Sequence, residues 1–212
     1  PAGVAARYDG QVTQTRGTVT SDQYPPMTYE EYLNSPEIPE HTEWVNGRVV
    51  PMMSVSKKHM YLTSYLIRLL GDYVEARQLG EILADPFNMN LGGGLAGRAP
   101  DVCFVRTSRL ELVRDQFLDG PADLVIEVLS PGTERIDRQE KFAEYQLGGV
   151  PEYWILDPQH GVAGLYGRGA DGMYRPGTIA PDGEFAVTVV DGLRIRVGWL
   201  WARTPVATVL FQ

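Results

Sequence analysis

The sequence has little cysteine and little histidine. Its 212 residues include one cysteine and three histidines. A single cysteine excludes an intramolecular disulfide and is typical of a reducing compartment. Cys103 lies in a predicted strand, and we interpret it as a small buried side chain. A structural zinc site is not expected, because such sites usually take four cysteine or histidine ligands. Chemistry in this chain is therefore sought among its carboxylates.

Segments that direct a chain to a membrane are also lacking. The apolar runs are far too short to span a bilayer. Residues 1–16 do not contain the apolar stretch behind a basic start that marks a signal peptide. We expect a cytoplasmic protein with no membrane partner.

The overall composition is that of an ordinary globular protein, with 43% hydrophobic and 22% charged residues. The length favours one domain, which we place at 27–212 after an N-terminal extension at 1–26. The formal net charge of −8 argues against a dedicated nucleic-acid binder. It does not exclude a nuclease, because nuclease sites concentrate acidic residues and balance them with bound metal.

The periodicity of the chain predicts strands that alternate with helices. Helices are predicted at 28–33, 56–78 and 134–147, and strands at 80–83, 87–91, 100–105, 124–129 and 151–157. The Asn46-Gly47 pair predicts a hairpin over 42–50. The strand, helix and strand at 124–157 fit a right-handed parallel crossover. After Pro158, repeated Asp-Gly pairs predict an antiparallel meander for the tail.

One carboxylate interrupts an apolar strand. Glu127 lies in the middle of the run 124–129, which is typical of a strand buried on both faces. An unpaired ionised glutamate is costly in such a place, so we predict a cation or a metal as its partner. The structural alternative is a buried salt bridge to Arg98 or Arg135.

Two further residues complete a candidate site. Asp101 lies at the start of another apolar strand, and Lys141 lies in the predicted helix 134–147. If the two strands are neighbours, Asp101 and Glu127 converge on one cation, and their oxygen ligands suit Mg²⁺ or Mn²⁺. Such an ion can bind a phosphate oxygen and lower the pKa of a bound water. These three residues are the minimal parts of a metal-dependent phosphodiesterase.

Other residues near this set have two interpretations each. Asp137 and Tyr145 lie four residues from Lys141 and share its helix face, so Lys141 either points into the site or is a solvated helix lysine. Glu43 is either a further metal ligand or an exposed strand acid. His59, at the start of a long helix, is more often a cap or a surface group than a catalyst.

Many short pieces of the sequence, in order, resemble a known family. The chain is similar to the bacterial Uma-two family of predicted endonucleases, which belongs to the restriction-endonuclease-like superfamily with its PD-(D/E)XK pattern. The matching pieces lie at 27–32, 43–47, 59, 100–101, 127–131, 137, 141, 145, 149–150, 152–154 and 157–158. They cover most of the chain.

The resemblance implies an α/β fold with an αβββαβ core and a mixed central sheet, together with an N-terminal hairpin and C-terminal antiparallel strands. It assigns Asp101, Glu127 and the backbone carbonyl of Val128 to the metal. The superfamily places its lysine two residues after the glutamate, where this chain has Leu129. The resemblance gives that role to Lys141. It gives supporting positions to Glu43, His59, Asp137 and Tyr145.

The implied function is that of a Mg²⁺- or Mn²⁺-dependent hydrolase that cuts nucleic acid. DNA is the expected substrate and a homodimer the expected assembly, because many nucleases pair two sites to cut two strands. A non-catalytic nucleic-acid- or protein-binding module on a nuclease fold stays open, since fold does not imply function. Both the net charge of −8 and Leu129 favour that second function. A structural homodimer whose carboxylates bridge subunits is the third.

Overall fold

The central feature of the protein is a six-stranded mixed sheet. The computed structural model describes residues 24–39, 42–51, 55–130, 132, 134–202 and 204–210. The strand order is β11-β10-β9-β8-β6-β3. These strands are β3 (Gly80–Ala84), β6 (Val102–Arg106), β8 (Leu124–Val128), β9 (Glu152–Asp157), β10 (Val162–Arg168) and β11 (Tyr174–Pro176). β8 and β9 are parallel, and the other neighbours are antiparallel.

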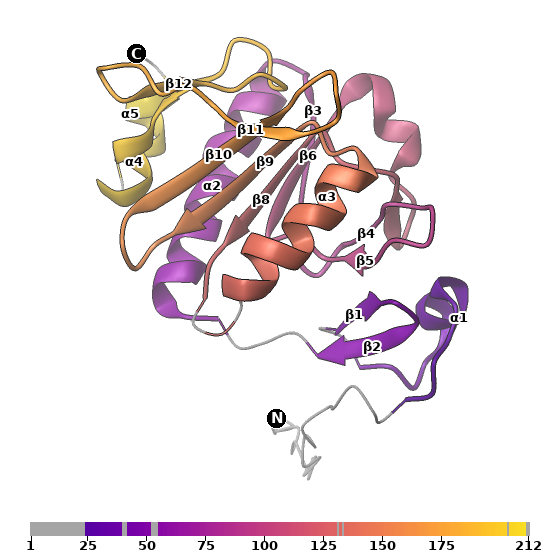
Figure 1. The fold of residues 1–212 in the computed structure, drawn as a ribbon. Coiled ribbons are helices and arrows are strands. Elements are labelled where there is room, and N and C mark those ends of the chain that lie inside the picture. Colours follow the sequence, from indigo (N-terminus) through magenta and orange to yellow (C-terminus); the bar gives the residue numbers. More distant parts are fainter. Residues whose placement is uncertain are drawn as a thin grey trace, which may run out of the picture.

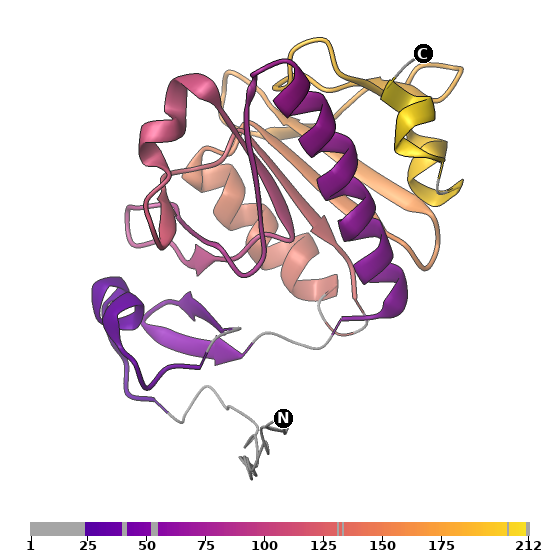
Figure 2. The ribbon, with the colours of Figure 1, turned by 180° about the vertical axis from the view of Figure 1, so that it is seen from behind.

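Helices on opposite faces cover this sheet (Figures 1 and 2). α2 (Lys57–Ala76) lies on one face, and α3 (Phe142–Gly148) lies on the other. The chain therefore runs α2, β3, β6, β8, α3, β9, which confirms the predicted αβββαβ core and the parallel crossover. Ser56 caps α2 by accepting a hydrogen bond from the His59 N–H.

Side chains of β8 alternate between two cores, as expected for a strand buried on both faces. Leu124, Ile126 and Val128 pack in the cluster on the α2 side. Val125 and Leu129 pack in the cluster that includes Tyr145, on the α3 side. Glu127 points to the same face as these last residues, which brings its carboxylate under the helix that carries Lys141.

A smaller part of the fold contains the N-terminal elements α1 (Tyr29–Asn34), β1 (Thr42–Val45) and β2 (Arg48–Pro51). Thr28 and Glu31 form a capping box at the start of α1. The predicted hairpin is confirmed, with φ of 51° at Asn46 and 82° at Gly47. This hairpin joins β4 (Asn88–Asn90), β5 (Gly97–Arg98) and β7 (Phe117–Asp119) in a second sheet of order β2-β1-β5-β4-β7.

Two predictions for the secondary structure need correction. The helix predicted at 134–147 contains a π-helical turn at Ile136–Lys141, which runs directly into α3. The antiparallel strands predicted after residue 158 are confirmed, but they do not form one meander: β10 and β11 join the central sheet, and β12 (Glu184–Ala186) and β13 (Arg194–Arg196) form a separate two-stranded sheet. Two helices that were not predicted follow, α4 (Val197–Ala202) and α5 (Val206–Leu210). Trp199 and Leu200 of α4 pack on the same core as α2, and this tertiary contact stabilises the helix although tryptophan favours strands.

The 107–120 segment forms a 3₁₀ helix at Thr107–Leu112 followed by the short strand β7. No helix among the described residues is long and apolar enough to cross a membrane. The extension predicted at 1–26 lies outside the described residues except for its last three positions, 24–26, so the boundary of the domain stays a prediction.

Candidate nuclease site

Asp101 lies at the end of the sheet, directly before β6. The register of β6 with β8 pairs Val102 with Ile126, and its continuation places Asp101 opposite Glu127. The Asp101 carboxylate accepts a hydrogen bond of 2.7 Å from the backbone N–H of Val128. Its oxygens also lie 3.0 Å from His59 Nε2, on α2. The predicted proximity of the two acids is thus a consequence of strand pairing.

Glu127 is almost fully buried, with 2% of its surface exposed. The Tyr145 hydroxyl donates to Glu127 Oε1 at 2.7 Å. Lys141 Nζ lies 3.0 Å from Oε2. Each oxygen of the carboxylate therefore has a separate partner, and both partners come from the helix over this face of the sheet.

The π-helical turn positions Lys141 and Asp137. Lys141 Nζ lies 3.2 Å from Asp137 Oδ1, four residues earlier. Both side chains are buried, although they are charged. The Asp137 carbonyl accepts a hydrogen bond of 3.0 Å from the Tyr153 hydroxyl of β9, which ties the turn to the sheet. Such single π-helical turns occur frequently at functional sites.

Glu43 enters the site from the N-terminal hairpin. Its Oε1 lies 3.9 Å from Lys141 Nζ and accepts a hydrogen bond of 3.2 Å from the Ala99 N–H. Its Oε2 accepts a hydrogen bond of 3.1 Å from Arg98. Glu43 is 8% exposed, so the interpretation as an exposed strand acid is wrong.

Arg98 lies next to the candidate site and joins Glu43 to Glu144, a role that was not predicted from the sequence. Its guanidinium also makes two hydrogen bonds to Glu144, of 2.8 and 3.0 Å. It is a partner of Glu43 and Glu144, whereas Arg135 pairs with Glu140. The salt bridge of Glu127 is thus formed by Lys141 and not by Arg98 or Arg135. An arginine two residues before Pro100-Asp101 was the only local sign of this connection.

The electrostatics of the cluster are dominated by burial and by crowded carboxylates. Burial raises the pKa of Glu127 well above its usual value; Lys141 lowers it, and Asp137 and Asp101 raise it further. Burial lowers the pKa of Lys141, but Glu127, Glu43 and Asp137 outweigh this effect and hold that pKa well above its usual value. Lys141 is therefore a charged ammonium group. The interpretation of Lys141 as a solvated helix lysine is wrong, because only 8% of its surface is exposed.

The described residues contain no group of three or more histidine, cysteine, aspartate and glutamate side chains arranged to hold a metal ion. Two facing carboxylates are nevertheless a common protein contribution to a Mg²⁺ site, since this ion keeps several waters. Burial raises the pKa of Glu127, and the negative charges of Asp137 and Asp101 raise it further; the same two charges favour a bound cation. The donor set fits Mg²⁺ or Mn²⁺ and does not fit a structural zinc ion.

The eight residues that the sequence assigned to the candidate site lie together at this end of the sheet. They come from β1, α2, the start of β6, β8, the π-helical turn and α3, and are Glu43, His59, Asp101, Glu127, Val128, Asp137, Lys141 and Tyr145.

Comparison with protein families gives the context of this site. A family model named Uma2, described as "Putative restriction endonuclease", matches residues 29–198. The chain belongs to the Uma2 family. The resemblance recognised from the sequence is thereby confirmed. The Uma2 match includes every residue of the candidate site.

Two curated relatives come from the cyanobacterium Synechocystis sp. The chain is 28% identical to the uncharacterized protein sll1609 over 133 residues, which is 62% of this chain and 75% of that protein. It is 29% identical to the uncharacterized protein slr1290 over 154 residues, which is 72% of this chain and 80% of that protein. Both names leave the activity of these relatives open.

The solved structure of a "putative nuclease belonging to DUF820" from Anabaena variabilis has the same fold. The TM-score is 0.68 at 18% sequence identity, and the match covers 84% of this chain and 98% of the other. The predicted α/β fold with a mixed central sheet is therefore confirmed.

Proposed function

We propose that this Uma2 protein is a Mg²⁺- or Mn²⁺-dependent endonuclease that hydrolyses phosphodiester bonds in nucleic acid, with DNA as the expected substrate. The observation that carries the proposal is the facing pair Asp101 and Glu127 at the end of the sheet, with the Lys141 ammonium 3.0 Å from Glu127 Oε2. Membership of a family described as endonucleases supports it.

Asp101 and Glu127 would hold the metal. The backbone of Val128 supports a third ligand, because the N–H and C=O groups of one strand residue point to the same side, and this N–H faces Asp101. The residue opposite Val128 in the continued register is Pro100, which has no N–H to donate to the Val128 carbonyl. A bound Mg²⁺ or Mn²⁺ would supply polarisation of a phosphate oxygen and a lowered pKa for a water.

Lys141 provides the fixed positive charge of the site. Its ammonium group has three donors and can orient an attacking water or neutralise charge that develops on the phosphate. Tyr145 and Asp137 fix its surroundings by holding Glu127 Oε1 and the ammonium group. His59 acts on Asp101, because it contacts that carboxylate from the opposite face of the sheet.

The test is cleavage of plasmid, linear and single-stranded DNA and of RNA by purified protein, with Mg²⁺, Mn²⁺ or EDTA. We expect cleavage only with metal, and its loss in Asp101→Asn and Glu127→Gln. Glu81→Gln is a matched control, because Glu81 is an exposed acid on β3 in the same sheet. Wild-type turnover in either site variant would exclude the mechanism.

Calorimetric titration of Mn²⁺ distinguishes the proposed nuclease from the alternative, a non-catalytic binding module on a nuclease fold. Binding to the wild type that is lost in Glu127→Gln supports the metal site. A wild type that neither cleaves nor binds Mn²⁺, even with nucleic acid present, would favour the non-catalytic module on a nuclease fold. The homodimer and the cytoplasmic location stay predictions.

A further inference from the structure

A hollow lies between α2 and the C-terminal helices, outside the carboxylate site. One part, of about 230 Å³, is lined by Lys58, Tyr61, Leu62, Tyr65, Pro158, Gly161, Leu200 and Trp201. A second part, of about 410 Å³, shares Tyr61 and Tyr65 and continues past Arg68 to residues 204–207. Because the two parts share Tyr61 and Tyr65 and both lie along α2, we call them together the α2 groove.

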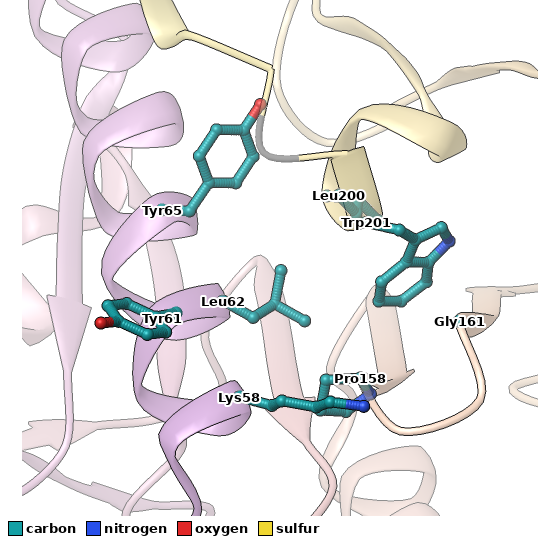
Figure 3. Close-up of a pocket in the computed structure, with 8 residues that line it drawn as sticks. All are labelled: Lys58, Tyr61, Leu62, Tyr65, Pro158, Gly161, Leu200 and Trp201. Atoms are coloured by element: carbon teal, nitrogen blue, oxygen red, sulfur yellow. The ribbon is translucent and has the colours of Figure 1, made fainter.

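Aromatic rings flank the first part of the α2 groove. Figure 3 shows Tyr65 on α2 and Trp201 on α4 on opposite sides, with Leu62 between them. The Tyr65 hydroxyl is buried and has no hydrogen-bond partner among the described residues, which is uncommon for a buried polar atom. Tyr61, at 40% exposure, adds a third ring, and Lys57 Nζ lies 5.4 Å from its centroid. Rings of this kind offer stacking surfaces for planar groups.

The α2 groove is locally basic, although the chain has a net charge of −8. Lys58 and Arg68 line it, and among the described lining residues there is no acidic side chain. A nearby acid is Asp157, and its carboxylate already accepts hydrogen bonds from the backbone N–H groups of Gln159 and His160 in the turn that follows it. Cations beside aromatic rings match a partner that carries both phosphates and flat bases.

The groove begins beside the proposed active site. Lys58, which lines the groove, is the neighbour of His59, which contacts Asp101. Lys58 Nζ donates to Gln159 Oε1 at 2.7 Å, just beyond the end of β9. Since β8 and β9 are parallel, the C-terminal end of β9 lies at the same end of the sheet as Glu127 and Val128, which are the last residues of β8. A strand that reaches the carboxylates can therefore continue into the groove.

We propose that the α2 groove binds an unpaired segment of nucleic acid, with bases stacked on Trp201, Tyr65 and Tyr61 and phosphates beside Lys58 and Arg68. Aromatic rings and cations also suit a peptide, and it is the proposed nuclease function that favours nucleic acid as the partner. The inference therefore rests on the proposed function. It makes the preferred substrate a nucleic acid with a single-stranded region next to the scissile bond. The two parts of the groove, of about 230 and 410 Å³, lie below and near the low end of the roughly 300–1,000 Å³ typical of sites for drug-sized ligands, so each fits a single base better than a large cofactor.

The test is fluorescence anisotropy with a short fluorescein-labelled oligo(dT), against its duplex with oligo(dA), in EDTA so that no cleavage occurs. We expect tighter binding to the single strand, and about tenfold weaker binding in Trp201→Ala and Tyr65→Ala. Lys58→Ala should lower the slope of log affinity against log salt by roughly 0.7. Ile67→Ala is the matched control, because Ile67 is an exposed apolar residue of α2 that does not line the groove.

A conservative variant keeps the test independent of folding. Oligo(dT) should quench the tryptophan fluorescence of the wild type. Trp201→Phe should retain binding within a few-fold and lose most of this quenching, because phenylalanine still stacks. Unchanged affinity in Trp201→Ala, Tyr65→Ala and Lys58→Ala, or a preference for duplex, would overturn the inference, as would capture of basic or aromatic peptides without any binding of oligo(dT).

The two proposals fail in different ways. If the wild type cleaves nucleic acid and Asp101→Asn does not, but the groove variants bind oligo(dT) normally, the groove inference is wrong and the nuclease stands. If no substrate is cleaved but oligo(dT) binds through Trp201 and Lys58, the groove inference stands and the nuclease is wrong.

Discussion

Lys141 Nζ lies 3.0 Å from Glu127 Oε2, although the lysine comes from a helix and the glutamate from the middle of a strand. The superfamily pattern places its lysine on the strand, two residues after the acid. Here that position is Leu129, which is buried in the apolar cluster on the same face as Glu127. The helix thus supplies a cation next to the carboxylate while the strand position adds to the core.

Removal of Lys141 should strongly destabilise the fold. Lys141→Met leaves Glu127 and Asp137 without their nearest cation, and loss of one partner of a buried ion pair costs about 3–5 kcal/mol. The free energy of unfolding is measured by urea denaturation. Lys57→Met is the control, because Lys57 is an exposed lysine at the start of α2. This substitution should change the free energy of unfolding by no more than about 0.5 kcal/mol.

The coupling between Lys141 and Glu127 should appear in a double-mutant cycle. Lys141→Met combined with Glu127→Gln should be less destabilised than the sum of the two single variants, with an interaction energy of about 1–3 kcal/mol. Additive effects would show that the 3.0 Å contact has no energetic weight.

Mn²⁺ affinity should increase with pH. Burial and the neighbouring acids Asp137 and Asp101 raise the pKa of Glu127, so the metal-free site retains a proton at pH values where an ordinary glutamate has lost it. Metal binding must release that proton, so affinity falls as pH falls through the raised pKa, by up to about tenfold per pH unit. Calorimetry in two buffers of different ionisation enthalpy measures the released proton. Affinity that is constant from weakly acidic to weakly alkaline pH would contradict the prediction.

Arg98 should stabilise the packing of the β1–β2 hairpin on the rest of the fold, because it joins Glu43 of β1 to Glu144 of α3. Arg98→Met leaves Glu43 and Glu144 without their guanidinium donor, and we expect a loss of about 3–5 kcal/mol, as for other broken buried pairs. Arg98→Lys should recover only part of this, because an ammonium group cannot make the paired hydrogen bonds to Glu144. Arg114→Met, in an exposed pair with Asp119, is the control and should have little effect.

Cys103 should be unreactive in the folded protein. Burial, and then the charge of Glu127, raise its pKa to about 12, so almost no reactive thiolate forms near neutral pH. Labelling with a disulfide reagent should proceed only as fast as the chain unfolds, and one thiol should react at once in denaturant. Rapid labelling of the native protein would contradict this burial.

The αβββαβ core could be predicted because its signals are local. The apolar run at 124–129, the Ser56 cap and the Asn46-Gly47 turn each act within a few residues, and each element lies where the sequence indicates. The C-terminal helices could not be predicted in the same way. Val197 and Gly198 are poor helix formers, and α4 packs Trp199 and Leu200 against the α2 side of the core, a tertiary contact that no local pattern specifies.

The members of the site could be predicted better than their contacts. Strand pairing brings Asp101 opposite Glu127, which the sequence anticipated on the condition that the strands are neighbours. The contact of Glu43 with Arg98 joins residues 55 positions apart, and no local pattern specifies such a pair. The roles of these residues in catalysis stay predictions until the variants are assayed.

The π-helical turn at Ile136–Lys141 has a consequence for how this site can change. A turn of this kind holds one residue more than the α-helix it interrupts, and deletion of one residue from it would restore regular winding. Regular winding advances about 100° per residue, so a deletion between Asp137 and Lys141 would leave the two residues three apart, still neighbours on one side of a regular helix. A relative that is one residue shorter between Asp137 and Lys141 therefore keeps the aspartate and the lysine side by side, and loses only the widened turn that now separates them.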